Sequence, residues 1–495
     1  MKYVLFVFAL IALKSSAQKY TFVESPAEVK DYLHKFFTTA SGKYVDVQYA
    51  APHGAFKADR DEKSAIVAVY DHQLKQLFSK SLSVTEGKTY EDGYSLGNKI
   101  VLLFSEKGKA VSAYELNPED GTAKLASALF SGEDEYTNMQ AGLSPDSALS
   151  YVICRYYHKK EPNTYTGVIL DKQLHIVSKI SASDEDKGND IGNVQFALSN
   201  EGVFNIITAV SGSDSKKDYN PFNYTVQQIN TNGKKTTGHL TGVPKGLFSD
   251  ISFQAAKNEL SFTGFITSEK NGRVTDVVAG VYDGVQKKIT QSKKSSFEDE
   301  IGNTATFMAY HKLKDNSTII IMQEGHTNSN TTTSYNPNGG FQSGYSRTSI
   351  TIVSGDLYVI KLNSNNELAW MKTVHKNQWE GQRYIYTGTV SLVDKDDNLH
   401  LFFQDCLKNT DLEDPKPPRA ILPGDKKHGL AIMLITKDGK MTKKFVDSFD
   451  KSQYSDCPFS TVDAITEGRN RVIYTSYDYK NIGRSRYHLA TVTVE

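Results

Sequence analysis

Tryptophan and cysteine are both rare in this sequence, with two and three residues among 495. Three cysteines over such a length are too few for the disulfide framework that holds small secreted domains together. An odd number also leaves at least one thiol unpaired. The sequence therefore has to fold around an apolar core, for which 39% hydrophobic residues, 11% of the chain being aromatic, are ample.

Neither sign of charge is in excess, because 57 lysines and arginines are matched by 57 aspartates and glutamates. Without the first seventeen residues, which include Lys2 and Lys14, the balance is 55 against 57, a net charge of −2. Proteins that bind nucleic acid usually carry a concentrated basic excess. We therefore expect no nucleic-acid partner.

Long hydrophobic runs are missing except for Val4 to Leu13, which is shorter than the roughly twenty residues that a membrane-spanning helix needs. Lys2 precedes this run and the small residues Ser15 to Ala17 follow it, an arrangement typical of a cleaved secretory signal. The alternative, a buried N-terminal strand, would be interrupted by Lys14. We expect residues 1–17 to be removed and residues 18–495 to be exported to a periplasm or outside the cell, with no transmembrane segment or lipid anchor.

What the chain does contain is one hairpin pattern, repeated almost from end to end. An alternating apolar strand, a polar turn and a second alternating strand recur, as in AIVAVYDHQLKQLFSKSL from Ala65, LYVIKLNSNNELAWMKTV from Leu357 and LAIMLITKDGKMTKKFV from Leu430. Alternation with a period of two, with β-branched and aromatic residues and Asn, Asp or Gly in the turns, predicts β-hairpins.

A second kind of hairpin lies between these copies, for example AGLSPDSALSYVICRYY and GTVSLVDKDDNLHLFFQ. Each repeat thus holds four antiparallel strands, a to d, without a helix between repeats, which predicts a single all-β domain folded as a β-propeller. Counting the outer hairpins gives eight blades, although the weak inner half of the first repeat leaves seven open. Two or three β-sandwich domains are the alternative, but they do not predict one hairpin signature at a fixed place in every repeat.

Both ends of the chain bear on how such a ring closes. The last repeat has strands a, b and c but lacks d, while KYTFVES near residue 19 is a spare strand, so we predict that residues 19–24 pair with residues 489–494. The next segment, SPAEVKDYLHKFF, has Ser25 as a capping residue, Pro26 at the first helical position and apolar residues three to four apart. These features predict one short helix over residues 25–37.

Two short stretches are similar to known propeller repeats. LSPDSALSYVI resembles the inner hairpin of TolB-type and WD40-type repeats, and VIKLNSNNELAW resembles the outer hairpin of PQQ-type secreted propellers. Each resemblance covers about a dozen residues and implies the fold alone, since such folds host unrelated functions.

Loop lengths in this topology differ between the two faces of the ring. The a-to-b and c-to-d turns are short, whereas the b-to-c loops from Ser211, His326 and Cys406 are long and the d-to-a connections carry acidic runs. Exposed loops are polar in most proteins, but this asymmetry in length favours a binding face rich in tyrosine and small polar residues. The predicted binding residues on it are Tyr219, Phe222, Tyr335, Phe341, Tyr345, Tyr157, Glu133, Asp134, Asp186, Glu298 and Asp299.

Three further predictions concern individual side chains. Asp184, Asp186 and Asp190 around Gly188, and Asp394, Asp396 and Asn398 in another turn, are weak candidates for a calcium site, since Ca²⁺ prefers six to eight oxygen ligands; turn geometry alone also explains the second group. Cys406 and Cys457 reach the long-loop side of neighbouring blades, which makes them a candidate disulfide, the alternative being three independent thiols.

Catalytic motifs do not decide the function, because no Gly-x-Ser-x-Gly elbow, P-loop, His-Glu-x-x-His or Cys-x-x-Cys occurs in the chain. Propeller active sites are assembled from distant loops, so an enzyme is not excluded. The favoured hypothesis is a monomeric recognition or scaffold protein without a cofactor that binds a protein or glycan on the long-loop face. The alternatives are a hydrolase or lyase with axial carboxylates, acting on carbohydrate or peptide, and a structural component of the cell envelope.

Overall fold

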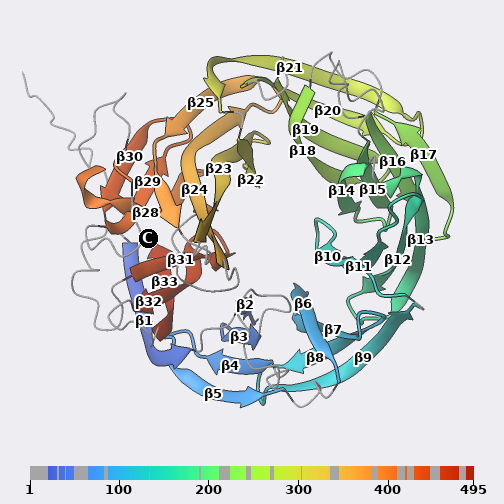
Figure 1. The fold of residues 1–495 in the computed structure, drawn as a ribbon, viewed down its shortest axis with the longest axis horizontal. Helices are drawn as coiled ribbons and strands as arrows, with labels where there is room; N and C mark the ends of the chain where they lie inside the picture. The colour runs from blue at the N-terminus through green and yellow to red at the C-terminus, as the bar shows by residue number, and fades with distance from the viewer. Residues whose placement is uncertain are drawn as a thin grey trace, which may run out of the picture.

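Strand pairing divides the chain into eight antiparallel sheets, which stand as blades around a central opening (Figure 1). The computed structural model describes residues 20–495 apart from 30–32, 40, 50–64, 83–86, 133, 189–190, 211–222, 241–246, 268–272, 303, 335–344, 381–387, 410–417, 421–427, 446–456 and 479–485. The predicted eight-bladed β-propeller is confirmed. In the described part of the chain no helix is long and apolar enough to cross a membrane.

In each blade the first strand lies nearest the axis and the fourth at the rim. Blades one to four are β2 Leu33–Thr38, β3 Tyr44–Tyr49, β4 Ile66–Tyr70 and β5 Gln76–Ser81; β6 Thr89–Leu96, β7 Lys99–Glu106, β8 Ala110–Asn117 and β9 Thr122–Ser131; β10 Asn138–Leu143, β11 Leu149–Tyr156, β12 Pro162–Asp171 and β13 Ile176–Lys187; β14 Ile191–Leu198, β15 Phe204–Val210, β16 Asn223–Ile229 and β17 Lys235–His239.

Blades five to eight follow the same order, except that the chain's first strand completes the last blade. They are β18 Leu247–Ala256, β19 Glu259–Thr267, β20 Val274–Asp283 and β21 Lys288–Ile301; β22 Ala305–Lys312, β23 Thr318–Ser334, β24 Tyr345–Leu362 and β25 Leu368–Val374, with β26 Gln378–Glu380 beside β24; β27 Val390–Val393, β28 Leu399–Cys406, β29 His428–Ile435 and β30 Met441–Phe445; β31 Cys457–Glu467, β32 Arg471–Asp478, β33 Arg486–Val494 and β1 Tyr20–Val29. A 3₁₀ turn, η2 Leu407–Asn409, follows β28.

The core lies between the blades rather than at the axis. Second strands are buried on both faces, and all eight residues of β28 are buried, because a neighbouring blade covers each side of the sheet. Outer strands such as β5 alternate between exposed and half-buried residues. Each hydrophobic cluster joins two neighbours, as where Phe37 and Val45 of blade one pack with Phe104 of blade two. Burial in these seams, at about 25 cal/mol per Å² of apolar surface, stabilises the ring.

Strand β1 closes the ring by pairing antiparallel with β33. Its register runs from Tyr20 opposite Val494 to Glu24 opposite Ala490, so the predicted pairing of the two chain ends is confirmed. Tyr20 and Phe22 pack against the cluster shared by blades seven and eight. The closing strand therefore contributes both its hydrogen bonds and apolar surface.

The helix predicted for residues 25–37 was wrong, since β1 and β2 occupy most of this segment. Phe36 and Phe37 are consecutive and both buried, but they belong to clusters on opposite sides of blade one. Only a strand directs neighbouring side chains to opposite faces. Pro26 lies where the β1 register shifts between Glu24 and Glu28, an irregularity that accommodates a residue without an amide hydrogen.

The alternating direction of the strands places all a-to-b and c-to-d turns on one side of the ring, which we call the short-turn face. The b-to-c and d-to-a connections lie on the other side, the long-loop face. Much of the long-loop face falls outside the described residues. The segment expected as a loop after His326 is largely strand, because β23 and β24 stay paired out to Ser334 opposite Tyr345.

Candidate functional site

The predicted binding residues are not gathered into one described site. Asp134 and Tyr157 are exposed near the junction of blades two and three, whereas Asp186 belongs to the outer strand β13. Glu298 and Asp299 lie on the outer strand β21 of blade five. Tyr345 begins β24. The other predicted members, which lie outside the described residues, are Glu133, Tyr219, Phe222, Tyr335 and Phe341.

Two of the three acidic runs, those from Ser183 and Phe297, were therefore assigned to the wrong kind of element. The segments containing Asp186 and Glu298 were expected as connections, but β13 and β21 extend through them as far as Lys187 and Ile301. Rim strands face solvent on one edge, and polar and charged residues on such edges protect them from pairing with other chains. The carboxylates on them need no ligand to explain their presence.

Asp184, a candidate calcium ligand from the sequence, is buried and its carboxylate links blades three and four through hydrogen bonds. Its carboxylate accepts hydrogen bonds from Asn163 Nδ2 at 2.8 Å, the Tyr165 hydroxyl at 2.9 Å and Thr208 Oγ1 at 3.1 Å. Burial raises the pKa of Asp184 above its usual value, although these donors act against that rise. No group of three or more potential metal ligands occurs among the described residues, and Asp190 lies outside them.

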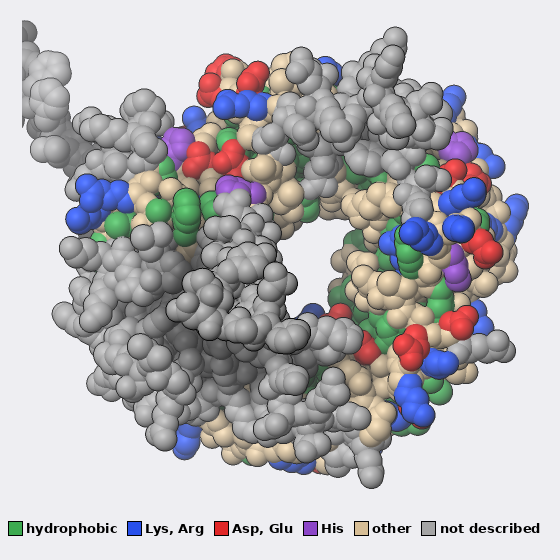
Figure 2. All heavy atoms as spheres, in the orientation of Figure 1, with side chains coloured by type: hydrophobic (Ala, Val, Ile, Leu, Met, Phe, Trp, Pro, Cys, Tyr) green, Lys and Arg blue, Asp and Glu red, His purple; other side chains and the backbone are tan. Residues whose placement is uncertain are grey.

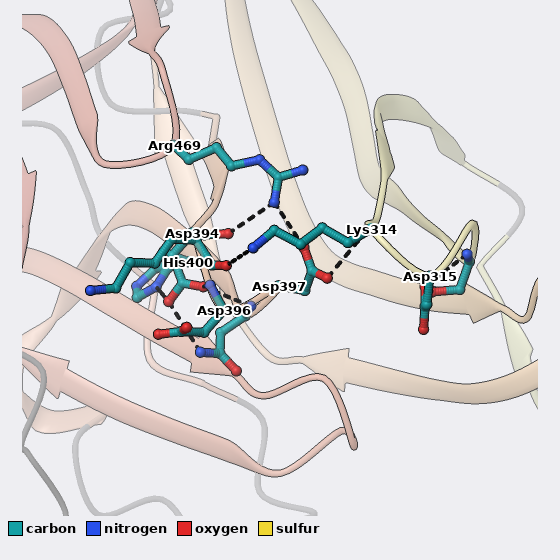
Figure 3. Close-up of polar contacts among 10 residues, drawn as sticks. Lys314, Asp315, Asp394, Asp396, Asp397, His400 and Arg469 are labelled. Atoms are coloured by element: carbon teal, nitrogen blue, oxygen red, sulfur yellow. Dashed lines mark hydrogen bonds and ion pairs between the residues drawn. The ribbon is translucent and has the colours of Figure 1, made fainter.

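The second predicted cation site is a hydrogen-bonded turn. Asp394 Oδ1 accepts from the backbone amides of Asp396 at 2.8 Å and Asn398 at 2.9 Å, while its Oδ2 lies 3.0 Å from His400 Nε2 (Figure 3). The other imidazole nitrogen of His400, Nδ1, lies 3.0 Å from the Tyr20 hydroxyl. The alternating acidic residues thus serve the turn and the closing blade, which accounts for them without a metal.

The disulfide prediction is contradicted, because Cys406 is a buried free thiol. Cys406 ends β28, the second strand of blade seven, where it pairs with His428. Cys457 begins β31, the innermost strand of blade eight. The two residues thus differ in both blade and radial position. Cys154 is a free buried thiol as well, and burial raises the pKa of its thiol well above the ordinary range.

Carboxylates on the inner strands were the alternative prediction for a catalytic centre. An opening passes through the middle of the ring (Figure 2), and β6 brings Glu91 and Asp92 to it. Asp92 is held by Lys35 Nζ of blade one at 3.0 Å. Glu91 accepts a hydrogen bond from Ser105 and lies near Cys154 of blade three. The two carboxylates therefore diverge towards different neighbours, unlike the facing pair of a glycosidase.

A cavity of about 890 Å³ opens on the short-turn face where blades three, four and five meet. We call it the blade 3–5 cavity. Its size lies in the range of sites that hold small organic ligands. The lining residues come from the inner hairpins of all three blades and the outer turn of blade five: Leu143, Pro145, Tyr151, Phe196, Ala197, Leu198, Asn200, Glu201, Phe253, Gln254, Ala255, Ala256, Lys257, Asn258, Glu259, Ser261, Asp283 and Val285.

Aromatic rings form part of the wall of this cavity. Tyr151 lies over Gly142, where a Cβ atom would come within 2.6 Å of the ring, so this position requires glycine. Phe196 meets Tyr151 edge to face at a centroid distance of 6.4 Å and stacks on Phe204 at 5.9 Å. Phe253 occupies the next inner strand, 5.9 Å from Tyr224. The rings are fixed by packing before any ligand arrives.

Polar groups occupy the same cavity beside these rings. Gln254, Lys257, Glu259 and Ser261 are exposed on the inner hairpin of blade five, and Glu201 is exposed on the turn of blade four. Lys257 holds its turn with a φ of 51°. Amides, carboxylates and a hydroxyl therefore surround an aromatic wall, and these groups can donate and accept several hydrogen bonds at once.

Sequence reasoning missed this cavity because its turns are of ordinary length and composition. One signal was present, since Phe196 in VQFALSN and Phe253 in ISFQAAKN lie two and three residues before the ends of the inner strands of consecutive repeats. A repeated aromatic residue that stays only partly buried would have pointed to this face. Loop length pointed to the opposite one.

Comparisons with known proteins add little beyond the fold. No protein-family model matches the chain, and no curated protein is similar to it in sequence. Among solved structures, it is similar to the WD40 domain of SCAP from fission yeast, with 10% identity over 96% of this chain and 98% of that one and a TM-score of 0.44. It is similar to polysaccharide lyase Uly1, with 8% identity over 96% and 99% of the two chains and a TM-score of 0.36.

Proposed function

We propose that this chain is an exported recognition protein that binds an oligosaccharide in the blade 3–5 cavity. The observation that carries the proposal is the combination of fixed aromatic rings with exposed amide, carboxylate and hydroxyl groups in one cavity of about 890 Å³. Export rests on the secretory signal predicted for residues 1–17.

The chemistry of a sugar matches both the aromatic and the polar residues that line this cavity. Sugar rings have apolar C–H faces that pack on aromatic rings such as Phe196 and Phe253, and hydroxyl edges that bond to side chains such as Gln254 and Glu259. Glu201, Glu259 and Asp283 outnumber Lys257 among the charged lining residues, so neutral or amine-bearing sugars fit better than uronic acids.

Replacing Phe253 by alanine should weaken oligosaccharide binding about tenfold, since loss of one stacking ring costs roughly 1.4 kcal/mol. The measurement is isothermal titration calorimetry against the best neutral oligosaccharide from a glycan array. Phe297→Ala is the matched control, because Phe297 is a partly buried phenylalanine on the outer strand of the same blade. Equal affinities for the two variants, or no neutral or amine-bearing glycan bound by the wild type, would count against the proposal.

The sequence-based hypothesis of a protein partner on the long-loop face is tested separately by trimming. Shortening residues 328–347 to a tight turn should leave folding intact, because the blade keeps its ladder up to Gln323 opposite Leu357. Capture of a protein partner in a pull-down should weaken, while glycan binding stays unchanged. Full capture after residues 411–427 are trimmed as well would refute a role for this face.

A further inference from the structure

A second cavity, of about 230 Å³, lies where blades six, seven and eight meet. Its residues come from the ends of the inner strands and the first turn of blade eight, so it opens on the same short-turn face as the blade 3–5 cavity. They are Tyr310, His311, Lys312, Ser391, Leu392, Val393, Thr466, Gly468 and Arg469. None of the functions considered so far uses this group, which combines three hydroxyls, an imidazole and two cations.

Ser391 and His311 form a hydrogen-bonded pair in this cavity, with 2.8 Å between Oγ and Nε2. Strand pairing fixes both residues, because His311 lies opposite Ile319 in blade six and Ser391 opposite Leu401 in blade seven. Burial lowers the pKa of His311 to about 4, so the imidazole is neutral near pH 7, although it is a weaker base than an exposed histidine. A serine within hydrogen-bond reach of a neutral imidazole is the arrangement of an activated nucleophile and its base.

Arg469 supplies positive charge to the same cavity. Its Nη1 is held 2.8 Å from Asp397 Oδ1 and 3.3 Å from the carbonyl oxygen of Asp394 (Figure 3). Asp397 is in turn fixed by the backbone amide of Lys314 at 3.2 Å. Arg469 and Ser391 line the same cavity, so this guanidinium can interact with negative charge that develops there.

From this geometry we propose that Ser391 and His311 form an esterase site for short acyl groups. Ser391 Oγ attacks the ester carbonyl as its proton passes to His311 Nε2, and the tetrahedral intermediate carries its negative oxygen towards Arg469. The carbon–oxygen bond of the alcohol then breaks, and the alcohol leaves with the proton from His311. Water, deprotonated by His311, attacks the acyl-serine, which releases the carboxylic acid and restores both side chains.

The size of the cavity limits the acyl group to a short chain, such as acetyl. The buried residues Leu392 and Val393 supply the apolar part of its wall. The site is distinct from the blade 3–5 cavity, and the proposal does not depend on oligosaccharide binding there.

The test is treatment of the full chain with a fluorophosphonate probe and with p-nitrophenyl acetate. Peptide mass mapping should place one phosphonyl group on Ser391, and Ser391→Ala should remove this adduct and lower kcat/KM for the ester at least 100-fold. His311→Gln, which keeps a side chain able to bond to Ser391 but cannot take its proton, should produce a similar loss. Ser317→Ala, in the turn of blade six, is the control and should react like the wild type.

Absence of an adduct on Ser391, labelling of another residue, or ester hydrolysis that persists in Ser391→Ala would each overturn the proposal. If Ser391→Ala fails to fold by circular dichroism, mapping of the adduct on the wild-type chain decides the matter alone. Glycan binding by Ser391→Ala is expected to match the wild type, so failure of either proposal is seen independently of the other.

Discussion

Deleting residues 18–25 should lower the melting temperature by about 10 °C, because blade eight then loses most of its outer strand. Five ladder positions opposite Ala490 to Val494 disappear with the deletion, and so do the side chains of Tyr20 and Phe22 from the seam with blade seven. Burial of each large side chain is worth roughly 1.5–3 kcal/mol. Differential scanning calorimetry measures the change.

A milder variant removes one polar side-chain contact of this strand and keeps the strand itself. Tyr20→Phe removes only the hydroxyl that bonds to His400 Nδ1, which should cost about 1 kcal/mol and a small part of the shift. An unchanged melt after the full deletion would refute closure of the ring through β1.

The free energy of unfolding should rise as the pH increases from 7 to 9, through the titration of Lys376. This side chain is buried between blades six and seven, where Nζ donates to Thr389 Oγ1 at 2.9 Å, Gln378 Oε1 at 3.0 Å and Gln323 Oε1 at 3.1 Å. Burial lowers the pKa of Lys376 to about 7 from an ordinary 10.5, although Asp405 and Asp356 act against it.

The sign of the effect follows from proton binding. Between the two pKa values the unfolded chain holds a proton on Lys376 that the folded chain has lost, so stability rises with pH in this window. Below pH 7 both states are protonated and the penalty for the buried charge is complete. The slope is at most about 1.4 kcal/mol per pH unit, and the whole effect is on the order of 5 kcal/mol.

Urea denaturation of the wild type and Lys376→Met at pH 7, 8 and 9 measures this slope. The unfolding free energy of Lys376→Met should depend less on pH than that of the wild type. The variant also leaves the amide and carbonyl acceptors around Nζ without their donor, which affects its stability at every pH. Lys314→Met, on an exposed turn of blade six, keeps Lys376 and should retain the wild-type slope. Parallel pH profiles for wild type and Lys376→Met would show that the buried amine does not titrate in this range.

The parts of the fold that the sequence predicted correctly depend on local patterns. Alternation and turn residues identify each hairpin without reference to its neighbours, and the absence of a fourth strand after Tyr487 indicates that another segment must complete blade eight. The helix prediction for residues 25–37 failed because the capping residue and apolar spacing of this segment fit a helix as well as a strand. Only the seams on both sides of blade one, which receive Phe36 and Phe37 separately, decide in favour of a strand.

The candidate sites were less predictable because distant hairpins build them. Phe196 and Phe253 belong to separate blades, and Ser391 and His311 are 80 residues apart in the chain. Their turns resemble every other turn of the ring, so no local motif distinguishes them. What distinguishes them is the incomplete filling of the space between blades, which depends on the volumes of side chains from three repeats at once.

Closure through β1 also bears on how the protein is made. Thr21 bonds to Glu495, 474 residues later, so blade eight stays incomplete until residues 486–495 have been synthesised. Until then β1 has no partner, and a newly synthesised molecule carries one loose strand and, at its other end, one open sheet edge. The same strand can complete the last blade of a second molecule, and concentration then determines whether rings close on themselves or join in domain-swapped dimers.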